Sequence, residues 1–179
     1  MKKILAFGAS NSRNSINKQL VTYAAGQLTD VEVLLLDLND FELPIYSIDR
    51  EKESGIPELA HQFKQHILDA DGILISFAEH NGAYTAAFKN VMDWASRLEG
   101  NIWEDKPMLL LATSPGGRGG KGVLNLAFTS FSFQNKKVSG SFSLPRFQQN
   151  FSPQEGILDP TLATELKAQL AAFTALVGA

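Results

Sequence analysis

Cysteine is absent from this sequence of 179 residues. Its absence excludes a disulfide framework, thiol chemistry and a zinc site built from cysteine and histidine, and we expect no bound metal. A reducing, cytoplasmic compartment fits this composition. The sequence also has no marked excess of charge of either sign. It contains sixteen Lys and Arg and nineteen Asp and Glu, the net charge is -3, and no run of like charge occurs. This balance argues against nucleic acid as a partner.

Long apolar runs are missing as well. The run over residues 4–7 meets Gly8 too early to form the core of a signal peptide, and polar Ser10 and Asn11 follow it. No stretch is long enough to span a membrane, so we expect no membrane association. The remaining composition, with 44% hydrophobic and 20% charged residues, is typical of a globular protein. The length favours a single domain over residues 1–179.

Apolar segments of strand length alternate with segments of helical spacing along the chain. A long irregular segment containing Pro44 and Gly55 separates the second strand from a helix that Pro57 starts. The alternation indicates an α/β protein in which helices cover both faces of a five-stranded parallel sheet. We expect strands over residues 4–7, 31–38, 72–77, 108–112 and 137–144, and helices through residues 20–28, 57–70, 85–98, from 123 onward and over 161–177.

Three loops follow the first, third and fourth of these strands. They are the segments 8–17, 78–84 and 114–122. In a parallel sheet the carboxyl ends of the strands meet at one edge, and ligands bind there at the point where the strand order reverses. These loops are therefore where we expect the site.

The first loop carries three serines, three asparagines and one arginine immediately before a helix. A helix N-terminus leaves about four backbone N–H groups without internal partners and carries a partial positive charge, so an anion is stabilised there. A simpler alternative is that Ser15 or Asn14 only caps the helix. Because the loop has many more donors than one cap requires, we favour phosphate binding. Arg13 either contacts that phosphate or remains solvated.

Two familiar nucleotide motifs do not explain the first loop. It lacks the Gly-Lys-Ser/Thr ending of a P-loop and the glycine pattern that binds a dinucleotide. A G-x-G-x-x-G pattern does occur at Gly117–Gly122, but the next acidic residue is Glu155, so no carboxylate stands about 20 residues on to hold a ribose. The sequence thus favours a mononucleotide on the first strand.

The second and third loops are rich in glycine, which lets main-chain amides approach the edge of a flat ligand such as a flavin. Two flexible turns are the alternative. Several motifs then resemble one family: Ser15-x-Asn17, the run Glu79 to Gly82, and Lys89-Asn90-Val91-Met92-Asp93-Trp94, with weaker support from Leu43–Tyr46. Together they resemble the NADPH-dependent FMN reductase family, which includes bacterial quinone, chromate and azo-dye reductases. The resemblance implies a flavodoxin-like three-layer sandwich.

The resemblance also implies the binding residues. The candidates for the FMN phosphate are Ser10, Ser12, Arg13, Ser15, Ile16 and Asn17, and those for the isoalloxazine are Ala78, Glu79, His80, Asn81, Gly82, Ser114, Pro115, Gly116 and Gly117. Hydride passes directly between nicotinamide and flavin, so we expect no catalytic side chain, and His80 is more consistent with positioning or packing than with acid–base work.

We therefore expect an oxidoreductase with ping-pong kinetics that uses FMN, takes hydride from NADPH or NADH, and reduces a small-molecule acceptor: a quinone, azo compound, metal oxyanion or free flavin. The alternatives are a flavodoxin-like electron carrier, which tends to be more acidic, and a module that binds another phosphorylated ligand. Members of the family are usually homodimers, and the apolar excess around Met92 and Trp94 could be covered by a partner helix. We expect a homodimer or homotetramer.

Overall fold

The computed structural model describes residues 1–178 and contains a five-stranded sheet with the strand order β2-β1-β3-β4-β5. All four neighbouring pairs in this sheet are parallel. The expected five-stranded parallel sheet is confirmed. Its strands are β1 (Lys2–Ala9), β2 (Val31–Leu36), β3 (Gly72–Phe77), β4 (Met108–Thr113) and β5 (Val138–Leu144).

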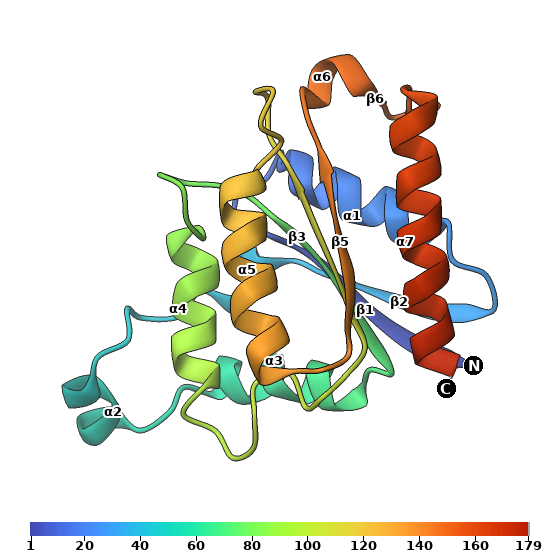
Figure 1. Cartoon of the computed structure of the whole chain (residues 1–179). Coiled ribbons are helices and arrows are strands. Elements are labelled where there is room, and N and C mark those ends of the chain that lie inside the picture. Colours follow the sequence, from blue (N-terminus) through green and yellow to red (C-terminus); the bar gives the residue numbers. More distant parts are fainter. Residues whose placement is uncertain (179) are drawn as a thin grey trace.

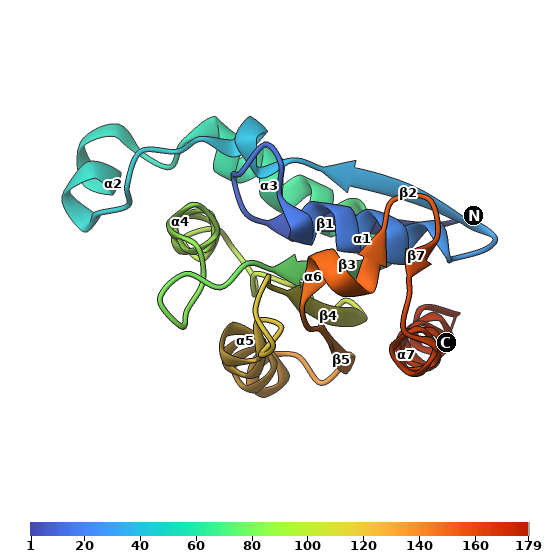
Figure 2. The same cartoon turned by 90° about the horizontal axis from the view of Figure 1, so that it is seen from above.

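Helices cover both faces of the sheet and form a three-layer sandwich (Figure 1). Figure 2 shows α3, α4 and α5 on one side of the sheet and α1 and α7 on the other, in agreement with the two clusters of buried side chains. These helices are α1 (Ile16–Gly26), α3 (Glu58–Asp69), α4 (Ala86–Ala95), α5 (Lys121–Gln134) and α7 (Pro160–Gly178). The shorter elements are the 3-10 helix η1 (Leu38–Phe41), α2 (Ile48–Ser54), α6 (Phe147–Asn150), β6 (Phe151–Ser152) and β7 (Gly156–Ile157).

The central strands are continuous apolar runs because each face of the sheet is covered. Every residue of β3 and β4 is buried, as expected for parallel strands between two helical layers. β2 lies at an edge, and its Leu34 and Leu35 remain 46% and 48% exposed. The expected extension of this strand to Leu38 is wrong. The Asp37 side chain accepts a hydrogen bond from the Asn39 backbone N–H and caps η1, which turns Leu38 into the core.

The segment after β2 is more ordered than its prolines and glycine predict. Besides η1 it contains α2, which Ser47 caps by accepting a hydrogen bond from the Arg50 backbone N–H at 3.1 Å. The helix ends at Gly55, whose φ of 75° suits glycine. Figures 1 and 2 show α2 projecting away from the sheet, beyond α4. The expectation of a long irregular segment is wrong here because helix caps, rather than apolar periodicity, define these short helices.

The apolar surface of α4 is used within the chain. The sequence predicts that Trp94 contributes to an apolar excess for a partner helix, but its side chain is fully buried, and its indole N–H donates to the Pro44 carbonyl at 2.7 Å. The Asn90 amide donates to the carbonyls of Leu43 and Pro44 and accepts from the Tyr46 backbone N–H. Two residues of the Lys89–Trp94 motif thus fasten the loop after β2 to α4.

Candidate functional site

The three predicted loops meet at the carboxyl edge of the sheet around a cavity of about 220 Å³, which we call the cradle. It brings together ten of the predicted site residues and adds Asn14 and Thr113, which are not among the predicted site residues. Arg13 lines a neighbouring cavity, whereas Asn81, Gly82, Gly116 and Gly117 are exposed outside the cradle lining. The cradle is lined by Ser10, Ser12, Asn14, Ser15, Ile16, Asn17, Ala78, Glu79, His80, Thr113, Ser114 and Pro115.

The first loop places the N-terminus of α1 directly on the end of β1. A Cβ at Gly8 would lie 2.7 Å from the Lys18 backbone nitrogen, so only glycine allows this approach. Ser15 caps α1 by accepting from the Lys18 backbone N–H at 3.2 Å. Within residues 1–178 neither a side chain nor a backbone carbonyl accepts a hydrogen bond from the backbone N–H groups of Ile16 and Asn17. The cap and the anion-binding interpretation are therefore compatible: capping engages one donor and leaves others free.

The serine hydroxyls of the first loop retain donating capacity. The Ser10 hydroxyl accepts from the Ser12 backbone N–H at 3.1 Å, and the Ser15 hydroxyl accepts from Lys18. A hydroxyl that accepts a hydrogen bond still has its own O–H to donate. Both side chains are largely buried at 7% exposure, which holds their oxygens in place. The loop thus presents fixed neutral donors, as binding of a phosphate requires.

The Asn17 side chain anchors the first turn of α1 to the sheet. Its amide donates to the Thr113 carbonyl at 3.1 Å and accepts from the Thr113 backbone N–H at 2.9 Å. Its carbonyl oxygen also accepts from the Ser76 hydroxyl at 2.7 Å. These contacts join the first turn of α1 to the ends of β3 and β4. Asn17 can therefore serve a bound anion through its backbone N–H, while its buried side chain fixes the helix.

The second loop is a tight hairpin. His80 and Ala83 exchange backbone hydrogen bonds of 3.0 and 3.1 Å, and Asn81 and Gly82 between them have φ values of 54° and 77°. Positive φ at both central residues is the pattern of a type I′ turn, for which Asn-Gly is the preferred pair. The following Thr85 caps α4 and donates its hydroxyl to the Ala9 carbonyl at 3.0 Å. The loop is thus held against β1.

Glu79 connects the second loop to the third. Its carboxylate accepts from the Val123 backbone N–H at 2.8 Å, in the first turn of α5. The N-cap position of this helix, Gly120, supplies no side-chain cap of its own. A carboxylate at a helix N-terminus is favoured by the partial positive charge there. Glu79 therefore replaces the missing cap, and this contact, between residues 44 positions apart, holds the two loops together.

Glycines of the third loop have two different roles. Gly119 and Gly120 have positive φ values of 59° and 72°, and a Cβ at Gly119 would lie 2.5 Å from the Ser143 hydroxyl. The turn into α5 requires them. Gly116 and Gly117 have ordinary φ values, and a Cβ there would find no atom nearer than 3.6 Å. The fold does not need glycine at these two positions, so their open surface beside the cradle remains available for the edge of a flat ligand.

An ion pair lies just behind the first loop. The Lys18 ammonium contacts the Asp37 carboxylate at the end of β2. The hydrogen bond from Lys18, followed by that from the Asn39 backbone, lowers the pKa of Asp37 to about 2. Among residues 1–178 we find no group of three or more His, Asp or Glu side chains that could hold a metal ion. No helix in this part of the chain is long and apolar enough to cross a membrane.

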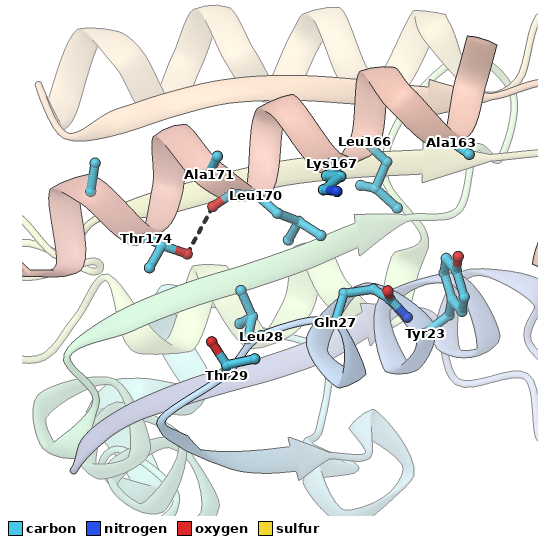
Figure 3. Close-up of a pocket in the computed structure, with 11 residues that line it drawn as sticks. Tyr23, Gln27, Leu28, Thr29, Ala163, Leu166, Lys167, Leu170, Ala171 and Thr174 are labelled. Atoms are coloured by element: carbon cyan, nitrogen blue, oxygen red, sulfur yellow. Dashed lines mark hydrogen bonds between the residues drawn. The ribbon is translucent and has the colours of Figure 1, made fainter. Parts of the chain in front are cut away.

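A larger cavity of about 620 Å³ lies elsewhere, between α1 and α7 (Figure 3). Its lining includes Leu28, Leu166 and Leu170, and it contains none of the predicted site residues. It also lacks the free helix N–H groups and the loop ends that converge on the cradle. Size therefore does not identify the site here; the convergence of donors does.

Known proteins resemble this chain over most of its length. The model of NADPH-dependent FMN reductases matches residues 2–149. An NADPH:quinone oxidoreductase from Arabidopsis thaliana is 32% identical over 97% of this chain and 90% of its own length. A 2-hydroxy-1,4-benzoquinone reductase from a Burkholderia species is 40% identical over 65% of this chain and 63% of its own. A solved flavoenzyme NAD(P)H:(acceptor) oxidoreductase from Paracoccus denitrificans shares the fold, with a TM-score of 0.77, 24% identity and coverage of 99% and 98%.

Proposed function

The chain belongs to the NADPH-dependent FMN reductase family, and from this premise we propose that it transfers electrons from NADPH or NADH, through FMN, to a small quinone. The chain is thus an oxidoreductase. The observation that carries the proposal is the convergence of three loops on a cradle that contains a helix N-terminus with free N–H groups. The quinone is chosen because relatives that match 97% of this chain carry that substrate in their names.

We assign the FMN phosphate to the first loop. A set of mostly neutral donors there suits a phosphate. It consists of the backbone N–H groups of Ile16 and Asn17 and the hydroxyls of Ser10, Ser12 and Ser15. Arg13 is exposed next to this set and adds a positive charge at its outer side. Because the hydroxyls of Ser10 and Ser15 are buried and held in place, these neutral donors would bind phosphate with well-defined geometry.

We assign the isoalloxazine to the second and third loops. Ala78, His80, Ser114 and Pro115 line the cradle opposite α1, and the open surface at Gly116 and Gly117, with Asn81 and Gly82 at the hairpin tip, extends beyond it. FMN supplies the capacity to accept a hydride and to release electrons. The protein residues bind and orient. His80 is exposed and its backbone forms the hairpin, which supports a positioning role.

The assembly and the compartment are further parts of the proposal. A single domain over residues 1–179 is supported by the five-stranded sheet, both faces of which are covered. The lack of cysteine supports a cytoplasmic location. A homodimer or homotetramer is supported by large apolar side chains that stay exposed, such as Ile45 on the loop fastened to α4 and Phe133 on α5, at 79% and 84%.

The purified protein provides the test. We expect a flavin absorption spectrum and bleaching of that spectrum by NADPH under anaerobic conditions, followed by reoxidation on addition of a benzoquinone. A coloured protein that NADPH does not bleach would instead be an electron carrier, and a colourless protein that binds no added FMN would contradict the proposal. Parallel assays with an azo dye, chromate and free FMN rank the other acceptors.

Ser15→Glu tests the phosphate site, because it places a carboxylate where the phosphate would lie. Ser47→Glu is the matched control, since Ser47 also caps a helix but belongs to α2. We expect Ser15→Glu to lose bound flavin and Ser47→Glu to retain it. Normal FMN retention in Ser15→Glu would show that the phosphate lies elsewhere.

A further inference from the structure

A second cavity, of about 420 Å³, adjoins the cradle along the outer side of α1. Asn14 and Ser15 line both cavities, so they form a common wall. The second cavity continues along α1 to Thr22 and Tyr23, and Phe151 of β6 also lines it. Its volume lies in the range of small-molecule sites, about 300–1,000 Å³. A ligand whose phosphate occupies the cradle could therefore extend over this wall.

The end of this cavity near the cradle is positively charged. Arg13 and Lys18 line it, and no aspartate or glutamate does. Lys18 is engaged with Asp37, whereas Arg13 makes no ion pair within residues 1–178. A guanidinium in this position is suited to a phosphate because it offers several donors in one plane.

The far end of the cavity is aromatic and firmly held. The rings of Tyr23 and Phe151 meet edge to face with centroids 5.5 Å apart, and Phe147 stacks on Phe151 at 4.7 Å. A Cβ at residue 156 would lie 2.1 Å from the Tyr23 ring, so Gly156 in β7 makes room for that ring. Aromatic side chains that are fixed in this way offer a surface on which a nucleobase can stack.

From this order of features we propose that the second cavity binds an adenosine phosphate, with the phosphate at Arg13, the sugar along Gln19 and Thr22, and the base against Tyr23 and Phe151. The proposal rests on the proposed function, because the phosphate cradle lies on the other side of the common wall. Two molecules carry this group. One is FAD, whose second phosphate would continue from the flavin phosphate over Asn14 and Ser15. The other is the nicotinamide cofactor, through its adenosine half.

The test fills the cavity without changing the cradle. Thr22 is exposed on α1 and lines the second cavity but not the cradle. The indole of Thr22→Trp should therefore occupy the space in which we place the sugar and base. Gln62→Trp, at an exposed position of α3 on the other face of the sheet, is the matched control. Calorimetric titration with ADP of the protein as purified measures the cavity directly. We expect Thr22→Trp to weaken ADP binding about tenfold or more, as loss of base stacking predicts, and Gln62→Trp to leave it unchanged.

Two further titrations distinguish the sources of the adenosine phosphate. Fluorescence titrations of apo-protein compare FMN with FAD, and titrations of FMN-loaded protein measure the affinity for NADPH. If Thr22→Trp weakens FAD but not FMN, the cavity receives the adenylate half of FAD; if it weakens NADPH, the cavity receives the adenosine half of the nicotinamide cofactor.

The inference is overturned if wild-type protein binds no ADP at millimolar concentration, or if Thr22→Trp binds ADP, FAD and NADPH as the wild type does. Retained FMN binding in Thr22→Trp and Gln62→Trp shows that the variants are folded. Failure of the proposed function would look different, because the wild type itself would then bind no FMN, and the ADP titration would still decide on the second cavity.

Discussion

Replacing Asn17 by leucine would remove the buried amide that holds the first turn of α1 against two strands. The side chain is 2% exposed and makes three hydrogen bonds, two with the Thr113 backbone and one with the Ser76 hydroxyl. Leucine has a similar volume but neither donor nor acceptor. The substitution would therefore leave the backbone N–H and carbonyl of Thr113 and the hydroxyl of Ser76 buried without these partners.

The expected loss of stability follows from these three groups. Each buried polar group that loses its partner costs about 1–3 kcal/mol. The Ser76 hydroxyl can rotate toward another acceptor, so we expect the free energy of unfolding to fall by about 3–5 kcal/mol. In a chain of this length about 1 kcal/mol lowers Tm by about 2–4 °C, so Tm should fall by about 6–20 °C.

Urea and thermal unfolding of the apo-protein measure this loss without a contribution from bound flavin. Asn135→Leu is the matched control, because Asn135 is also buried and bonds to the backbone of Lys106 and Lys137, at the end of α5 opposite the third loop. Both variants should be destabilised, but only Asn17→Leu should weaken FMN binding at a temperature where both are folded. A cost below about 1 kcal/mol for Asn17→Leu, or an equal loss of FMN affinity in both variants, would refute this reasoning.

Three further predictions concern stability. Because the pKa of Asp37 is lowered to about 2 by Lys18, the pair stabilises the fold above pH 3.8 and loses its effect as pH falls toward 2. Solvent access reduces the contribution of Asp37 to about 1 kcal/mol. In urea titrations, Asp37→Asn should therefore be less stable than the wild type by that amount at pH 7 and should match it near pH 2. Lys64 is buried and contacts Glu104 and the Asn101 carbonyl, so Lys64→Met should lower the free energy of unfolding by about 2 kcal/mol, and an unchanged urea midpoint would contradict this. Burial raises the pKa of Tyr84 to about 12, and its hydroxyl has no hydrogen-bond partner among residues 1–178, so Tyr84→Phe should be neutral or stabilising by up to about 1 kcal/mol, and a loss above about 1 kcal/mol of stability in the same assay would reveal a missed partner.

The parts of the site that could be predicted from sequence depend on neighbouring residues. Ser15 as the cap of α1, and the free N–H groups beside it, follow from a serine placed just before a helical pattern. The Asn81-Gly82 pair likewise has a local preference for the turn it forms. In the same way, apolar runs separated by helical patterns predicted the five parallel strands. The observed bounds of the first helix and of several strands differ from the predicted ones by a few residues.

Other parts required the folded chain. Nothing near Glu79 in the sequence indicates that its carboxylate caps α5, and nothing near Trp94 indicates that its N–H bonds to the Pro44 carbonyl. The excluded G-x-G-x-x-G pattern is a similar case. Its central Gly119 and the adjacent Gly120 serve the turn into α5, which only their φ values and neighbours reveal.

The sequence by itself determined the layers of this protein, the edge of the sheet where we propose the ligand site, and the donor-rich loop before α1, because periodicity, capping and turn preferences act over a few residues. The tertiary structure decided which side chains remain available for a ligand. The side-chain amide of Asn17 is hydrogen-bonded to Thr113, 96 residues away, and the carboxylate of Glu79 is hydrogen-bonded to the backbone of α5, 44 residues away. A buried polar group binds whatever partner the fold brings to it, and distance along the chain does not specify that partner.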